Sequence, residues 1–175
     1  MRRLVILSLW IASAASAQAP GARADTLVAQ ALDARRAGYD AVAVDLFHAA
    51  LAREPSPRAL ALCGLAEQAL SRFADADAHL RLALAALDDP WITPRRAVLE
   101  RALREAEAQV ARVTLIGVPD GAAIRVDGRA TMLAQGALSL TPGEHELMVE
   151  PPGRAPWVLR ETFAAGAIER AVRIE

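Results

Sequence analysis

The sequence predicts an α+β protein of two separate domains, an all-α domain followed by a small all-β domain. Two observations in the 175 residues carry this prediction. From residue 25 to residue 110, apolar side chains recur every three or four positions, which is the period of an amphipathic helix. After Arg112 they alternate within short segments that Gly, Pro and Asp separate, as in strands joined by tight turns.

The first 17 residues have the layout of a secretory signal peptide. Arg2 and Arg3 give a positive start, residues 4–12 form an apolar run, and the small residues 15–17 form a cleavage site. An uncleaved membrane anchor is the alternative, but the run is shorter than the roughly 20 residues that span a bilayer. We therefore expect an exported protein, periplasmic or extracellular, that is cleaved after Ala17 and is not an integral membrane protein.

Composition and charge exclude two further classes of protein. The chain is 54% hydrophobic, which is too apolar for a disordered protein. Its net charge of −1 becomes −3 without residues 1–17, and no basic tract is present, so nucleic acid is not an expected partner.

The single cysteine, Cys63, has no internal disulfide partner. We expect it to be a small buried apolar residue, with a reactive thiol or an intermolecular bridge as the alternative.

Residues 18–24 are expected to form a short flexible lead and residues 25–111 an α-helical domain. Within this domain one pattern of small and large apolar residues recurs 33 positions later. The corresponding pairs are Leu27 and Leu60, Ala31 and Gly64, Ala43 and Ala76, Phe47 and Leu80, and Ala50 and Ala83. Self-similarity at this period is typical of stacked pairs of helices.

The helical domain resembles the tetratricopeptide repeat family. The residues that carry the resemblance are Gly38, Ala43, Phe47, Ala50 and Pro55 in the first unit and Gly64, Phe73, Ala76, Leu80 and Ala83 in the second. Asp40 and Glu67 depart from the family pattern, which usually has an aromatic residue there, and Gln30 replaces a usual Leu. The resemblance implies two helical hairpins whose inner surface binds a peptide.

The segment 93–111 is predicted to be a capping helix that closes the stack. Thr93 is the expected N-cap, and Pro94 follows at the first helical position. The apolar face consists of Leu99, Leu103, Ala106 and Val110, and the pairs Arg96 with Glu100 and Arg101 with Glu105 have the spacing of helical ion pairs. Trp91 is expected to pack under this helix, with a ligand contact as the alternative.

The first helix of each unit is expected to line the inner surface of the stack. The candidate contacts for a partner are Asp25, Val28, Leu32, Arg35 and Arg36 from the first unit and Arg58, Ala61, Leu65 and Gln68 from the second. Arg35, Arg36 and Arg58 would offer planar guanidinium donors to a carboxylate of the partner. The alternative is that these three arginines are solvated charges on a helix face.

Residues 112–175 are predicted to form a small antiparallel β-sandwich. Strands are expected at 113–118, 123–126, 137–140, 145–150, 157–163 and 168–174, with turns at the Gly-containing segments between them. The block is similar to the PEGA domain family. The resemblance rests on Pro119-Asp120-Gly121-Ala122, with Asp in place of the family's Glu, on Ile124-Arg125-Val126-Asp127-Gly128, and on the strand, Pro-Gly and His layout of residues 138–145. It implies an extracytoplasmic β module without catalytic machinery.

The chain has no sequence motif for catalysis, a cofactor or a metal. His48, His79 and His145 do not stand at zinc-ligand spacing with each other or with Cys63, and phosphate-loop and Gly-x-Ser-x-Gly patterns are absent. We therefore expect that the protein is not an enzyme and has no cofactor and no metal site.

The expected function is that of a non-catalytic adaptor of the cell envelope. Its helical repeats would bind a protein or peptide partner, and its β domain would dock on the envelope or on a second partner.

A second class of function remains open at this point. The β domain is an alternative binding module for peptidoglycan or another carbohydrate, with Trp157 as the candidate sugar contact. Against it stands the scarcity of aromatic residues, which make up 4% of the chain.

Overall fold

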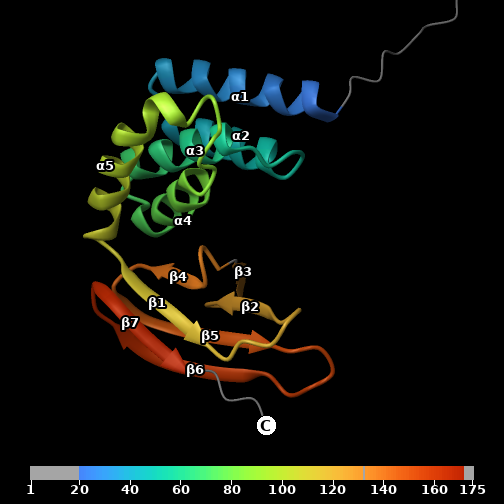
Figure 1. The fold of residues 1–175 in the computed structure, drawn as a ribbon, viewed down its shortest axis with the longest axis vertical. Helices are drawn as coiled ribbons and strands as arrows, with labels where there is room; N and C mark the ends of the chain where they lie inside the picture. Colours follow the sequence, from blue (N-terminus) through green and yellow to red (C-terminus); the bar gives the residue numbers. More distant parts are fainter. Residues whose placement is uncertain (1–19, 132, 172–175) are drawn as a thin grey trace, which may run out of the picture.

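The computed structural model describes residues 20–131 and 133–171, and the signal peptide expected at residues 1–17 lies outside them. Within the described residues, five α-helices precede seven β-strands in an α+β layout. Helices and strands occupy opposite ends of the molecule (Figure 1). No helix in the described part of the chain combines the length and the apolar character needed to cross a membrane.

The helical part begins earlier than expected. Its elements are α1 (Pro20–Arg36), α2 (Asp40–Leu51), α3 (Pro57–Ala69), α4 (Phe73–Leu84) and, after a 3-10 turn at Thr93–Arg95, α5 (Arg96–Glu107). Residues 20–24 belong to α1, so the prediction of a flexible lead over 18–24 is wrong for them. Pro is well tolerated in the first turn of a helix, and Ala24 is buried beside Ala50 and Ala59.

The helix boundaries recur with the 33-residue offset of the sequence pattern. The corresponding ends are Arg36 and Ala69 for α1 and α3, Asp40 and Phe73 at the starts of α2 and α4, and Leu51 and Leu84 at their ends. The turns correspond as well, since Gly38 and Ser71 have positive φ angles of 82° and 59°. The N–H groups of the following residues, Tyr39 and Arg72, each donate to a carbonyl five positions earlier at 2.9 Å. The chain thus forms two helical hairpins of the same design.

Gly64 allows the close approach of α3 and α4. A Cβ at this position would lie 2.8 Å from Cγ of Leu80 and 3.2 Å from the carbonyl oxygen of Ala76. Leu80 is fully buried, so its side chain has little room to move away. A small residue next to a large one is therefore what the packing of this hairpin requires.

The start of α5 differs from the predicted cap. The hydroxyl of Thr93 donates to the carbonyl oxygen of Asp89 at 2.8 Å instead of accepting from the helix. The Asp89 carboxylate accepts from the N–H groups of Trp91 and Ile92 at 2.8 and 2.9 Å, in the turn that precedes the 3-10 segment, and α5 itself has no side-chain cap. Trp91 itself packs against the helical cores as expected.

The predicted ion pairs of α5 are replaced by contacts with other helices. Arg96 donates to the carbonyl oxygens of Leu84 and Ala86 at the end of α4, at 3.2 and 3.3 Å. The last carbonyls of a helix lack partners within it, and a guanidinium satisfies that of Leu84 and the one of Ala86 just beyond the helix end. Glu105, the predicted partner of Arg101, accepts from the amide of Gln68 on α3. The helix ends at Glu107, and the chain enters the β part four residues later.

The β part contains seven strands in two sheets. The strands are β1 (Ala111–Ile116), β2 (Ala123–Val126), β3 (Arg129–Thr131), β4 (Ala137–Leu140), β5 (Gly143–Glu150), β6 (Trp157–Phe163) and β7 (Gly166–Ala171). One sheet has the order β4-β1-β7 and the other β3-β2-β5-β6. Buried residues of both sheets, among them Val113, Leu138, Leu147 and Phe163, share one core.

Two features of the sheets were not predicted. The short strand β3 pairs with β2 directly after the turn at Asp127 and Gly128. Strand β7 runs parallel to β1, so the expectation of a wholly antiparallel arrangement is wrong at this pair. The parallel pair arises because the chain passes from one sheet to the other between β6 and β7.

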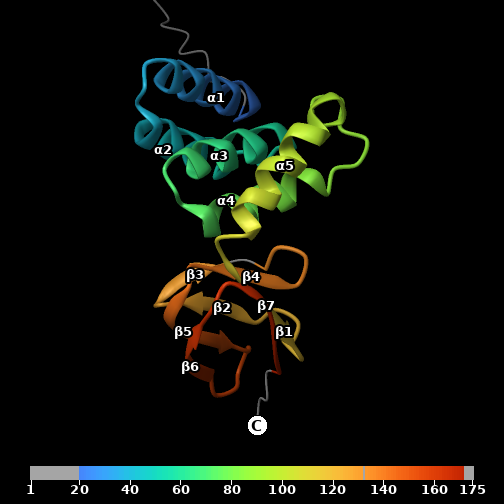
Figure 2. The ribbon, with the colours of Figure 1, turned by 90° about the vertical axis from the view of Figure 1, so that its left-hand side faces the viewer.

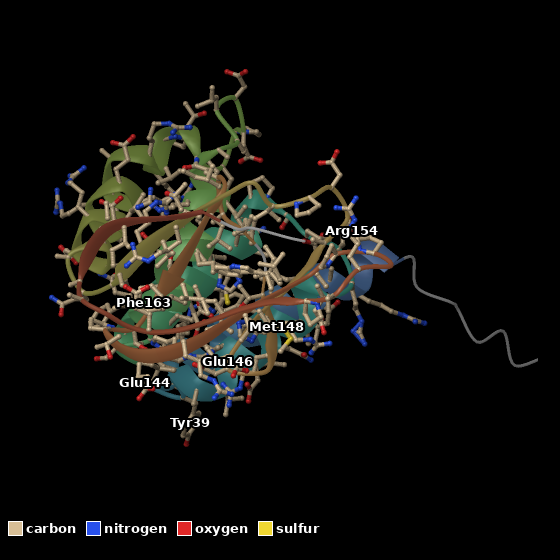
Figure 3. All side chains as sticks on the ribbon, turned by 90° about the horizontal axis from the view of Figure 1, so that it is seen from below. Tyr39, Glu144, Glu146, Met148, Arg154 and Phe163 are labelled. Atoms are coloured by element: carbon tan, nitrogen blue, oxygen red, sulfur yellow. The ribbon has the colours of Figure 1, made fainter. Side chains whose placement is uncertain are left out.

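Strand β5 shows the alternation that the sequence predicts for the segments after Arg112. Leu147 and Val149 are fully buried, while Glu144 is exposed and Glu146 and Met148 are half-buried. Figure 3, which views the molecule from the sheet end, shows Glu144, Glu146 and Met148 following one another along this strand. The outer face of the second sheet is therefore polar at its centre.

The helical and β parts meet where α4 lies over β4 (Figure 2). Both elements bring polar side chains to this junction.

Candidate functional site

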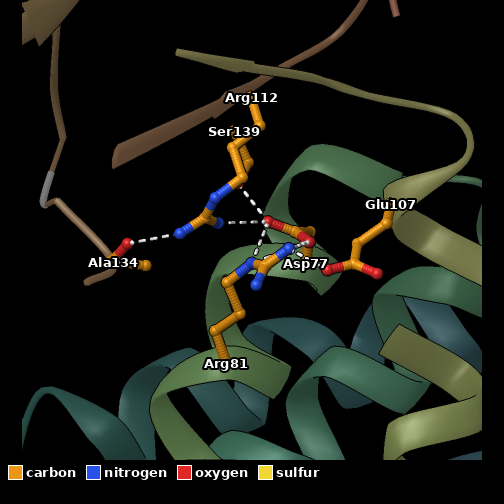
Figure 4. A network of polar contacts seen from close by, with 6 residues as sticks. All are labelled: Asp77, Arg81, Glu107, Arg112, Ala134 and Ser139. Carbon is orange, nitrogen blue, oxygen red and sulfur yellow. Dashed lines mark hydrogen bonds and ion pairs between the residues drawn. The ribbon is translucent and has the colours of Figure 1, made fainter. Parts of the chain in front are cut away.

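A buried ionic network joins the two parts. Asp77 of α4 has no exposed surface, and its carboxylate accepts from Nε of Arg81 at 3.1 Å and from the hydroxyl of Ser139 on β4. Nη1 of Arg112, on β1, lies 3.5 Å from the same carboxylate, and Arg81 also pairs with Glu107 (Figure 4). A buried charge is stable where paired and hydrogen-bonded groups replace its hydration, so these contacts fix the β part against α4.

A groove lies beside this network and is called here the junction groove. It encloses about 550 Å³ and takes its walls from both parts of the protein. Arg72 and Asp75 contribute the helical wall, and Asp127, Arg129, Thr131 and His145 contribute the β wall. A second hollow of about 300 Å³ shares Asp75 and Thr131 with it and extends along α4 to His79.

Two edge strands border the junction groove. Strand β3 ends one sheet and β4 ends the other, and Thr131 of β3 and Ser139 of β4 both line the groove. The outer side of an edge strand carries backbone N–H and C=O groups that can pair with an added strand.

Three residues of the groove have the spacing of a catalytic triad. Thr141 would be the nucleophile, His145 the base and Asp127 the acid. His145 Nδ1 lies 2.7 Å from a carboxylate oxygen of Asp127, and Nε2 lies 3.2 Å from the hydroxyl of Thr141. However, Nε2 also lies 2.8 Å from the carbonyl oxygen of Thr141, which is an acceptor. The hydroxyl and the carbonyl oxygen of Thr141 thus both lie on the Nε2 side of the ring, and Asp127 lies on the Nδ1 side. These contacts join the turn after β2, which contains Asp127, to the turn before β5, which contains Thr141.

The pKa of Asp127 is lowered by the geometry of this loop. The backbone N–H of Glu146 donates to its carboxylate at 2.9 Å and has the larger effect, and the hydrogen bond with His145 adds to it.

A second polar cluster lies inside the helical part. His48 of α2, Cys63 and Glu67 of α3, and His79 of α4 place one ligand-type atom each within 4.8 Å of all the others. His48 Nε2 lies 2.9 Å from one carboxylate oxygen of Glu67, and His79 Nδ1 lies 2.7 Å from the other. Glu67 and Cys63 are fully buried, while the side chains of His48 and His79 keep 41% and 21% of their surface exposed. We call these four residues the His-Cys-Glu-His cluster.

The environment shifts the pKa values of three members of the cluster. The hydrogen bond with Glu67 raises the pKa of His48 against the opposing effect of burial. Burial alone would raise the pKa of Glu67, but the hydrogen bonds from His48 and His79 outweigh it and lower the pKa. Burial raises the pKa of the Cys63 thiol. Without a metal, Glu67 is therefore a carboxylate and Cys63 a neutral thiol.

The sequence pattern did not predict this cluster. Its members come from three helices, and His48 and Glu67 stand 19 positions apart, so no short motif contains them. One signal was present, because Glu67 is an acid at a position where the repeat pattern has an aromatic residue. It also follows Cys63 by four positions, which places both on one face of α3.

The predicted inner surface is partly covered. Val28 and Ala61 are buried in the helical cores, and Leu32 packs against the core of the first hairpin. Leu65 packs beside the core formed with α5, and the amide of Gln68 donates to Glu105 of α5 at 2.9 Å. Leu65 and Gln68 serve packing because α5 lies against α3, and the local sequence pattern does not specify that contact.

The predicted arginine cluster is dispersed. Arg35 pairs with Asp40 at 3.2 Å, and Arg36 pairs with Asp33 at 2.5 Å. Arg58 is exposed at the start of α3. The position of the second unit that corresponds to Arg35 lies ten residues after Arg58 in the chain. Ten residues correspond to roughly 15 Å along a helix axis. Asp25 is exposed near the start of α1, beside a small hollow of about 90 Å³.

Trp157, the candidate sugar contact, is half-buried. It pairs with Val149 across β5 and β6 and packs against the core of the β part. Part of its indole is therefore engaged within the protein.

No protein-family model, curated protein or solved structure matches this chain.

Proposed function

We propose that this protein is a non-catalytic extracytoplasmic adaptor that binds an extended segment of a protein partner in the junction groove. The observation that carries the proposal is the groove itself, whose walls come from α4 on one side and from the edge strands β3 and β4 on the other. A peptide lying there pairs with an edge strand through its main chain, and its side chains contact α4.

The groove presents charges of both signs to the partner. Arg72 and Asp75 lie on the helical side, and Arg129 and Asp127 lie on the β side. Such a surface selects a segment with both acidic and basic residues, because charged groups that remain unpaired on binding lose hydration without compensation. The Asp77 network holds the two walls in place before binding, which lowers the entropy cost of association.

The architecture supports the two family resemblances as part of this proposal. The recurrence of helix ends and of the turns at Gly38 and Ser71 supports tetratricopeptide-like repeats in the helical part. Two sheets around one core support a PEGA-type β-sandwich in residues 112–175. Together with the export signal expected at residues 1–17, these resemblances support a location of the proposed adaptor in the cell envelope, outside the cytoplasm.

Site-specific crosslinking tests this proposal. A photoreactive residue at Ala130, which is exposed on β3 beside the groove, should crosslink one protein from an envelope extract. The same residue at Arg104, exposed on α5, is the matched control and should not. Equal crosslinking from both positions, or none from Ala130, contradicts the proposal.

Charge reversal distinguishes the junction groove from the predicted inner surface. The double variant Arg72→Glu and Arg129→Glu should reduce capture of the partner at least about tenfold, which corresponds to 1.4 kcal/mol. The double variant Arg35→Glu and Arg58→Glu, on α1 and α3, should retain capture. If the Arg35 and Arg58 variant loses capture and the Arg72 and Arg129 variant keeps it, the partner binds the inner helical surface and not the junction groove.

A further inference from the structure

We propose that His48, Cys63, Glu67 and His79 form a binding site for one zinc-type divalent ion. The four side chains converge from α2, α3 and α4, and their ligand atoms lie within 4.8 Å of one another. This inference is independent of the junction groove and of the adaptor function.

The donor set has the chemistry of a zinc site. Two imidazoles, a thiolate and a carboxylate are ligands that zinc accepts, whereas magnesium and calcium prefer oxygen ligands alone. A zinc ion with one thiolate, one carboxylate and two neutral imidazoles has no net charge. Neutrality suits this location, because Cys63 and Glu67 have no exposed surface.

The geometry requires only a small rearrangement of the ligand atoms. In a tetrahedral zinc site, bond lengths of roughly 2.1 Å to nitrogen or oxygen and 2.3 Å to sulfur place ligand atoms about 3.5 Å apart. The two imidazole nitrogens already point at the carboxylate of Glu67, and their distances of 2.9 and 2.7 Å would lengthen on binding, while the longest separations, which are within 4.8 Å, would shorten. The ion would replace the hydrogens that these nitrogens now direct at Glu67.

The backbone already fixes the positions of the ligands. Cys63 and Glu67 stand four residues apart on one face of α3, so both point in the same direction. His79 lies on α4, which Gly64 allows to approach α3 closely, and His48 lies on α2. Four protein ligands complete a tetrahedron, so the ion is structural and ties the two hairpins to each other.

An ion can reach the site from solvent. His79 lines the hollow of about 300 Å³ beside the junction groove, and the side chain of His48 is 41% exposed. The buried ligands Cys63 and Glu67 lie behind the two imidazoles. The two histidines are therefore accessible to solvent and the other two ligands are not, so an ion can enter past the imidazoles after the protein has folded.

Metal titration of the purified full chain, first stripped with a chelator, tests the proposal. Zn²⁺ should bind in a ratio of one ion per chain and, at about 100 times its Kd, raise Tm by roughly 5 °C or more. Co²⁺ should give the visible bands of a tetrahedral site and a thiolate-to-metal charge-transfer band. Absence of stoichiometric binding would show that the cluster is a hydrogen-bonded core only.

Variants identify the ligands. Cys63→Ser should remove the charge-transfer band, and both Cys63→Ser and Glu67→Gln should weaken Zn²⁺ binding at least about tenfold. His145→Ala changes a histidine outside the cluster and should leave affinity and stoichiometry unchanged. Circular dichroism checks that each variant folds. If Glu67→Gln does not fold, His48→Gln replaces it, because this side chain is partly exposed. Unchanged binding in Cys63→Ser and His48→Gln overturns the proposal.

Discussion

The hydroxyl of Ser139 donates a hydrogen bond to the buried carboxylate of Asp77, and this bond joins two residues 62 positions apart. Ser139 lies on β4 and Asp77 on α4, so the bond crosses the junction between the helical and β parts. Arg81 and Arg112 complete the surroundings of the carboxylate. The relative placement of the two parts, and with it the junction groove, depends on this network.

Asp77→Ala should lower the free energy of unfolding by roughly 3 to 5 kcal/mol, because Arg81 and Arg112 then lose their shared buried partner. Ser139→Ala removes one hydrogen bond to a charged group and should cost about 1.5 to 3 kcal/mol. Asp75→Ala, on the exposed side of the same helix, is the control and should change stability by less than about 0.5 kcal/mol. Urea denaturation measures all three, and equal costs for Asp75→Ala and Asp77→Ala would contradict the role of the network.

Gly64→Ala should destabilise the protein by about 1 to 2 kcal/mol. The new methyl group would meet Leu80 at 2.8 Å, and this overpacking exceeds the gain of about 1 kcal/mol in helix propensity. In a Leu80→Ala background the same change should be neutral or stabilising, because the methyl group then has room. Chemical denaturation of the four proteins gives the coupling between the two positions, and a coupling of zero refutes the close contact.

Asp127→Asn should lower stability at neutral pH but not in acid. The folded protein lowers the pKa of Asp127, so the carboxylate contributes stability that is fully present above its unfolded pKa of about 3.9. This contribution is lost as the pH falls through the folded pKa. Unfolding by urea at pH 7 and at successive values below pH 4 should show the difference between variant and wild type shrinking. A difference that grows in acid would have the wrong sign. Asn is a suitable replacement because it tolerates the positive φ of 50° at this position.

Trp157→Ala should leave retention of the protein on purified sacculi unchanged. Part of the indole packs against the β core, and the proposed function uses a different surface, the junction groove. Pull-down with wild type and variant measures this, with circular dichroism to confirm folding. Loss of retention in a folded variant would instead support the peptidoglycan alternative.

The helical hairpins were predictable because their design is local. The spacing of Ala43, Phe47 and Ala50 and its recurrence 33 residues later reflect contacts within one hairpin, and the structure repeats helix ends at the same offset. The strands at 123–126, 137–140 and 157–163 also lie where the alternation predicted them. The extent of α1, the turn that Asp89 stabilises before α5 and the strand β3 were missed, since each depends on a few residues without a strong pattern.

The candidate sites were far less predictable. Leu65 and Gln68 were expected on an open surface, but α5 covers them. His48 and His79 gave no zinc-ligand spacing, yet the packing of three helices brings both to Glu67. A sequence pattern reports which face of a helix is apolar but not which neighbour that face meets.

The sequence by itself determined the order of helices and strands, the 33-residue period and the alternation of β5, because these follow from backbone periodicity and from the side chains of near neighbours. The tertiary structure alone decided that Asp77 meets Ser139, that Glu67 lies between two histidines, and that a groove forms where α4 faces the strand edges. Those contacts join residues far apart in the chain, and their positions depend on how the helices and sheets pack together.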